Sequence, residues 1–253
     1  MLAHVHATVL TALLVAPALA FGPAGQEAGS AAAAGAPGAE RDVSEVLEGF
    51  RSLHQVAGLA AVAVGPEGIE ARGVCGVRTK GADSALTARD AVRIGKCTVA
   101  VTALLAAAMV DAGDVEWGTT LGETFDVPMH EAWKPVTLME LLTNFGGMPE
   151  YLLDGGLWNE LTAHRGTGRE QRRDIVRHVL KAPPPNEPGK WSYSEPGIAV
   201  AAAMLEAAAD ATWETLVRER VFEPLGMEDA GFGDPDAARG HNHDGTPRAP
   251  GEG

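Results

Sequence analysis

The chain has 253 residues, of which 45% are hydrophobic and 21% charged, a globular composition that allows one substantial core or two smaller ones. Its formal net charge is −14. An acidic chain repels nucleic acid and anionic lipid, so neither is expected as a partner.

The N-terminal segment differs in composition from the rest. Residues 9–20 read VLTALLVAPALA, an apolar run that is too short to span a bilayer and that ends in small residues. This pattern predicts a signal peptide over 1–20 and a secreted or periplasmic protein, although the run is preceded by histidines rather than Lys or Arg. Residues 21–41 are rich in Ala, Gly and Pro and predict a flexible linker, so one folded domain is expected over 42–253.

The folded part begins with a helix and a hairpin. Residues 42–56 have helical apolar spacing. The apolar run 59–64 and the segment 69–77 flank a Gly-Pro-Glu-Gly turn and predict two antiparallel strands. The polar residues 79–90 predict a loop.

Helices follow over most of the remaining chain. An almost wholly apolar helix is predicted over 98–112 and ends at Gly113. Further helices are predicted over four ranges, 136–142, 169–181, 198–209 and 212–222. Thr212 is a suitable N-cap for the last of them. The order of elements predicts an α+β fold.

Four stretches carry a resemblance to a known family. They read RIGKCTVAVTALLAAAMVDAGDVEWGTTL, VTLMELLTNFGGMPEY, GKWSYSEPGIAVAAAMLE and WETLVRERVFEPLGMEDAGFG, and the Pro224–Met227 motif is the most specific feature. In this order they resemble the serine β-lactamase and penicillin-binding-protein superfamily. The similar branch contains class C β-lactamases, D-alanyl-D-alanine carboxypeptidases and esterases.

The resemblance implies a partial serine β-lactamase-like fold over about 42–253. Such a fold is a helical subdomain plus an incomplete antiparallel sheet, since the family closes its sheet with C-terminal strands that have no counterpart in this sequence. The predicted hairpin would then keep an open edge, which favours pairing with a partner chain or self-association.

The resemblance also implies a site. The family performs acyl transfer with a serine and a lysine one helical turn later. Alignment places Lys96 at the serine and Val99 at the lysine, and no Ser-x-x-Lys occurs anywhere in the chain. Tyr193 keeps the family's tyrosine position, whereas Glu195 replaces the following asparagine. Asn144 and Gly146 replace the family's His and Ser in a further segment.

Lys96 has two interpretations. A lysine at a helix N-terminus is disfavoured by the helix dipole, which would lower its pKa and release a nucleophilic amine. Acylation of that amine would give a stable amide, so turnover is not expected. The alternative is that Lys96 fills the former site and forms an ion pair with Glu195.

The remaining candidates are weaker. Cys97 follows Lys96 but has no basic partner in the sequence pattern, and Cys75 and Cys97 either pair or remain free thiols. His241 and His243 have a spacing that binds metal only if other ligands converge. A His-x-Gly match at 243–245 falls too early in the chain for the family motif. No metal and no cofactor are expected.

Three functions remain open. The first is an inactive, exported family member that binds a peptidoglycan peptide or a small acyl ligand, or is a remnant. The second is a weakly active acyl hydrolase of esterase, carboxypeptidase or β-lactamase type, with a non-standard nucleophile or a partner chain. The third is an interaction protein that pairs through its open sheet edge.

Overall fold

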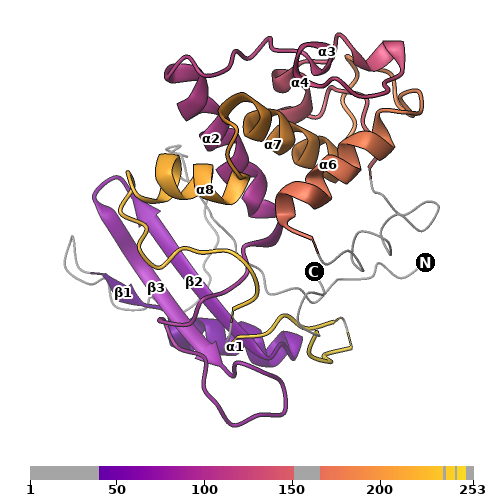
Figure 1. Cartoon of the computed structure of the whole chain (residues 1–253). Helices are drawn as coiled ribbons and strands as arrows, with labels where there is room; N and C mark the ends of the chain where they lie inside the picture. The colour runs from indigo at the N-terminus through magenta and orange to yellow at the C-terminus, as the bar shows by residue number, and fades with distance from the viewer. Residues whose placement is uncertain (1–39, 151–165, 236–237, 243, 249–253) are drawn as a thin grey trace, which may run out of the picture. The chain divides into compact units, whose positions relative to one another are not determined.

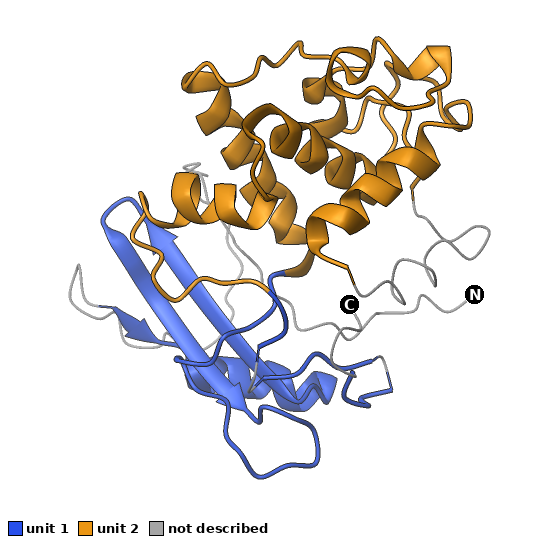
Figure 2. Ribbon diagram, in the orientation of Figure 1, with its two compact units in different colours: residues 1–94, 233–253 blue, residues 95–232 orange. Residues whose placement is uncertain are grey.

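The computed structural model describes residues 40–150, 166–235, 238–242 and 244–248. The chain forms two compact units, residues 1–94 with 233–253 and residues 95–232 (Figure 2). The predicted signal peptide and nearly all of the predicted linker lie outside the described residues. The combination of a small sheet with many helices confirms the predicted α+β class (Figure 1).

The first unit contains a three-stranded sheet in the order β1-β3-β2. β2 (Gly58–Gly65) and β3 (Gly68–Gly76) form the predicted hairpin, with Gly58 opposite Gly76 and Gly65 opposite Gly68. The sequence analysis expected an antiparallel sheet, but β1 (Arg41–Asp42) pairs parallel to β3. That part of the expectation is wrong. Two charged residues carry no strand pattern, and only the tertiary pairing makes them a strand.

Helix α1 (Ser44–His54) lies on the sheet through its polar side. The Ser44 hydroxyl accepts a hydrogen bond from the Val74 N–H at 3.0 Å. A Cβ at Gly73 would lie 2.6 Å from the Ser44 nitrogen, so only glycine permits this close approach. The apolar stripe of α1, formed by Val46, Phe50 and Leu53, is exposed.

The second unit is helical and holds the main core. Its elements are η1 (Gly95–Cys97), α2 (Thr98–Asp111), α3 (Leu121–Thr124), η2 (Glu131–Trp133), α4 (Leu138–Leu142), α6 (Gly168–Val179), α7 (Glu195–Ala209), α8 (Trp213–Val217) and the π-helical turn η4 (Arg218–Phe222). Thr212 caps α8 as predicted. Among the described residues, no helix has the length and apolar character needed to cross a membrane.

The apolar helices α2 and α7 pack together within this core. Leu105 and Met109 of α2 and Met204 and Leu205 of α7 are at most 1% exposed. Neighbouring helices cover most of α7, whereas α2 keeps one exposed side at Leu104, which is 47% exposed. α7 begins at Glu195, three residues before its predicted start, because Ser194 caps it and Pro196 fits its first turn.

Candidate functional site

Lys96 lies in the short turn that leads into α2. Gly95 has a φ of 50°, which lets the chain turn at the start of η1. Cys97, the N-cap residue of α2, makes no side-chain capping hydrogen bond. The Lys96 side chain is 66% exposed, so it is held at the N-terminal end of a buried helix while it remains open to solvent.

The loop before α7 presents Tyr193 and Glu195 on either side of Ser194. Ser194 is buried, and its hydroxyl accepts a hydrogen bond from the Gly197 N–H at 2.9 Å and donates one to the Pro149 carbonyl at 2.6 Å. Both interactions fix the loop to its surroundings. Ser194 is therefore a capping residue, and its two neighbours, Tyr193 at the end of the loop and Glu195 at the start of α7, are half-buried.

Asn144 holds the same loop from the other side. Its side-chain Oδ1 accepts a hydrogen bond from the Ser194 N–H at 2.9 Å, and its carbonyl oxygen accepts one from the Ser192 N–H at 2.8 Å. The backbone of Asn144 is left-handed, with a φ of 64°. The family pattern predicts no positioning role for Asn144, although an Asn at the end of a helix before a glycine pair is a signal for this conformation.

Lys96, Tyr193 and Glu195 come together. The Lys96 Nζ lies 2.6 Å from the Glu195 Oε1 and 5.1 Å from the centroid of the Tyr193 ring. The Tyr193 hydroxyl is 3.5 Å from the same carboxylate oxygen, at the limit of a hydrogen bond. The ion pair expected from the sequence is thus present, reinforced by a cation–π contact.

The expectation that the helix dipole lowers the pKa of Lys96 is wrong. Hydrogen bonding to Glu195 raises the pKa of the Lys96 amine above its ordinary value, against a smaller opposite effect of burial, and Tyr193 adds to the rise. The pair acts at 2.6 Å, whereas the amine lies on an exposed side chain where the dipole is screened. Lys96 is therefore a protonated cation at neutral pH.

Val99 occupies the first turn of α2 and is half-buried. Its alkyl side chain can neither accept nor donate a proton. The positions that the resemblance assigns to the nucleophile and its base thus hold a protonated amine and a hydrocarbon. This arrangement can attract charged groups, since both partners of the Lys96–Glu195 pair are exposed, by 66% and 41%.

The other sequence candidates lie elsewhere. Cys75 is half-buried, Cys97 is exposed, and both are free thiols, so the structure gives no disulfide. His241 Nε2 accepts a hydrogen bond from the Lys80 N–H at 2.9 Å, and burial lowers the pKa of this imidazole. Within the described part of the chain no three potential ligands gather to hold a metal. His243 lies outside the described residues.

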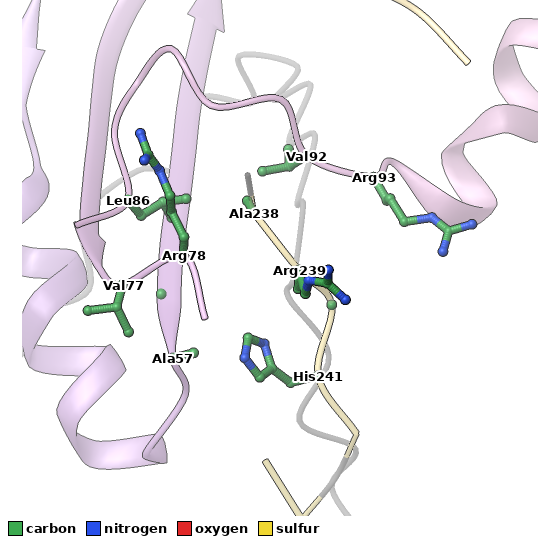
Figure 3. A pocket seen from close by; sticks show the side chains of 11 residues that line it. Ala57, Val77, Arg78, Leu86, Val92, Arg93, Ala238, Arg239 and His241 are labelled. Atoms are coloured by element: carbon green, nitrogen blue, oxygen red, sulfur yellow. The ribbon is translucent and has the colours of Figure 1, made fainter. Parts of the chain in front are cut away.

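His241 points into a small cavity of the first unit, about 50 Å³ in volume (Figure 3). Two of the arginines that line this cavity form ion pairs with aspartates. Arg78 pairs with Asp90 at 3.0 Å, and Arg93 pairs with Asp234 at 2.9 Å. The remaining wall is largely apolar and includes Ala57, Val77, Leu86, Val92 and Ala238. This cavity contains none of the residues aligned with the family's site.

A buried apolar helix whose first turn meets a tyrosine-bearing loop is the arrangement expected for the serine-hydrolase fold of β-lactamases and penicillin-binding proteins. The family model named Beta-lactamase matches residues 43–252, and the chain belongs to this family.

Known proteins agree with this assignment. Penicillin-binding protein 4 of Amycolatopsis lactamdurans is 28% identical over 187 residues, which is 72% of this chain and 46% of that protein. Lovastatin esterase of Penicillium rubens is 29% identical over 100 residues, 39% of this chain and 25% of the esterase. The chain therefore spans half or less of the length of these relatives.

Solved structures show the same fold at low identity. The β-lactamase/D-alanine carboxypeptidase of Pseudomonas syringae has a TM-score of 0.66 at 17% identity, with 81% of this chain and 56% of that chain covered. The D-alanine carboxypeptidase of Burkholderia cenocepacia has a TM-score of 0.64 at 21% identity, with 83% and 56% covered. These values confirm the partial β-lactamase-like fold.

Proposed function

We propose that this chain is a catalytically inactive member of the Beta-lactamase family that binds a peptidoglycan-type peptide or small acyl ligand without cleaving it. The observation that carries the proposal is the 2.6 Å ion pair between Lys96 and Glu195 at the aligned nucleophile position. A protonated amine has no lone pair for attack on a carbonyl, and Val99 offers no base to deprotonate it.

The residues around the pair suit a small peptide ligand. A ligand carboxylate would approach the exposed Lys96 amine, and a ligand amide or ammonium group would approach Glu195. Trp191, 63% exposed and two residues before Tyr193, offers an apolar surface on the same loop. The relatives named penicillin-binding protein and D-alanine carboxypeptidase support a D-alanine-terminated peptide as the first ligand to examine.

A peptide from the cell wall requires a protein outside the cytoplasm. The apolar segment 9–20 with its small-residue ending supports export and cleavage after Ala20. We therefore propose a secreted or periplasmic location for the mature chain. N-terminal sequencing of the exported protein tests this part of the proposal, and a retained Met1 would contradict it.

Covalent labelling tests the absence of catalysis. The full chain is incubated with a fluorescent penicillin and with a fluorophosphonate, and no label should remain after denaturation. A labelled Lys96 or Cys97 found by mass spectrometry would overturn the inactive assignment and favour hydrolysis by a non-standard nucleophile. The double variant Lys96→Ser, Val99→Lys is labelled in parallel, because it restores the family's serine and lysine at their aligned positions in the same backbone.

Binding is tested separately with diacetyl-L-lysyl-D-alanyl-D-alanine. Tryptophan fluorescence and calorimetry should give a saturable signal that Lys96→Met abolishes. Lys190→Met is the matched control, since Lys190 also forms an exposed pair at 2.6 Å, with Glu187. Absence of saturable binding, or equal losses in both variants, would contradict the assignment of Lys96 to the ligand site.

A further inference from the structure

Glu195 is held in place by the backbone around it. It is the first residue of α7, Ser194 caps the helix before it, and Pro196 follows in the first turn. Its N–H also donates a hydrogen bond to the Glu150 carbonyl at 3.3 Å. Lys96 lies in the short turn before α2 and reaches the carboxylate on a long and flexible side chain. A ligand at this pair therefore meets a fixed carboxylate beside a cation that can adjust.

The fixed carboxylate opposes any ligand that brings only a negative charge. The Lys96 Nζ lies 2.6 Å from the Glu195 Oε1, so an anion bound to the amine must also come close to Glu195. Like charges at such a separation repel, and the net charge of −14 on the chain adds to the repulsion. An anionic ligand therefore needs a second group, a hydrogen-bond donor, that pairs with the Glu195 carboxylate.

The C-terminus of a peptide carries both groups on one carbon. Its carboxylate and the N–H of the same residue lie about 3 Å apart, which is close to the 2.6 Å between the Lys96 amine and the Glu195 carboxylate. Such a terminus can place its carboxylate on the amine and its N–H on the carboxylate without separating the pair. The two side chains are 66% and 41% exposed, so both are open to this approach.

We propose that Glu195 determines specificity, by selecting ligands that carry an N–H beside the terminal carboxylate. This inference rests on the proposed function, in which Lys96 receives the ligand carboxylate. An ester with an oxygen in place of that N–H should bind weakly, because its lone pairs would face the Glu195 carboxylate. The asparagine of the family's pattern offers both a donor and an acceptor, so it would not discriminate in this way.

Two ligands that differ only in this group test the proposal. Diacetyl-L-lysyl-D-alanyl-D-alanine and its ester counterpart, diacetyl-L-lysyl-D-alanyl-D-lactate, are titrated into the full chain by calorimetry. The wild type should bind the peptide roughly 10-fold more tightly than the ester. The amide in Glu195→Gln offers both an acceptor and a donor, so the ester should gain affinity and the ratio should fall to about 1.

Glu187→Gln is the matched control, because Glu187 forms the exposed pair with Lys190 and its loss should leave the ratio unchanged. Equal affinities of the wild type for the two ligands would overturn the role of Glu195 and leave the proposed function intact. A preference for the peptide that persists in Glu195→Gln would do the same. No saturable binding of either ligand, by the wild type and by Glu195→Gln, would contradict the proposed function and this inference together.

Discussion

The Lys96 amine lies 2.6 Å from the Glu195 carboxylate and 5.1 Å from the centroid of the Tyr193 ring. The carboxylate keeps the amine protonated, and the ring faces the resulting cation. One ion pair thus holds a protonated amine at the position aligned with the family's nucleophile.

Glu195→Gln should therefore make Lys96 more reactive. Loss of the carboxylate lowers the pKa of the Lys96 amine toward its ordinary value, so more free amine is present in alkaline solution. Mass spectrometry of acetylation by acetic anhydride should show faster modification of Lys96. Glu187→Gln, which removes the partner of Lys190, should leave Lys96 unchanged. The stability change should stay under about 1 kcal/mol, because the pair is exposed.

Two variants of Asn144 separate the contribution of its hydrogen bond from the contribution of backbone strain to the unfolding free energy. Asn144→Gly keeps the left-handed backbone but removes the acceptor for the Ser194 N–H, and should cost about 1 kcal/mol of unfolding free energy. Asn144→Ala also removes the acceptor and adds about 1 kcal/mol of strain at a φ of 64°. Urea unfolding of both variants tests this order. A more stable Ala variant would show that the loop relaxes to a different backbone.

A buried guanidinium joins three helices of the second unit. Arg172 of α6 lies 2.7 Å from Glu206 of α7 and 2.9 Å from Glu214 of α8, and the Glu206 side chain is 3% exposed. Arg172→Met leaves two carboxylates without their cation and should lower the unfolding free energy by about 3 kcal/mol. Arg177→Met removes an exposed pair with Asp174 and should cost under about 1 kcal/mol. Equal costs in thermal unfolding would contradict this difference.

Helix α1 should contribute an acid-sensitive part of the stability. Hydrogen bonds from Arg51 and then Ser52 lower the pKa of Glu48 to about 2, from an ordinary value of 4.5. Because the folded pKa is the lower one, the contribution is complete above about pH 4.5 and is lost as the pH falls toward about 2. The difference in unfolding free energy between wild type and Glu48→Gln should therefore shrink over this range.

Glu45→Gln in the same helix is the control for this pH dependence. Glu45 lies in the first turn and is exposed. Urea unfolding at a series of pH values is measured for wild type and for both variants. A Glu48→Gln difference that stays constant to the acid end would show that the ion pair with Arg51 adds nothing to folding.

The sequence by itself determined the order and type of the longer elements, but not β1, α3 or η2. Apolar patterning located α1, β2, β3, α2 and α6 to within a few residues. The apolar stripe of α1 is nevertheless exposed, so its pattern predicted the helix but not the face that packs. The motif order identified the family, and the aligned positions drew attention to Lys96 and Glu195, whose pairing the coordinates confirm.

Only the tertiary structure decided the features that depend on contacts between residues far apart in the sequence. β1 exists only because β3 pairs with Arg41 and Asp42, and the pKa of Lys96 rises because Glu195, 99 residues later, lies beside it. Asn144 became a positioning residue only when its Oδ1 met the Ser194 N–H, 50 residues away. Periodicity reports which face of an element is buried, whereas such contacts depend on how the chain brings remote segments together.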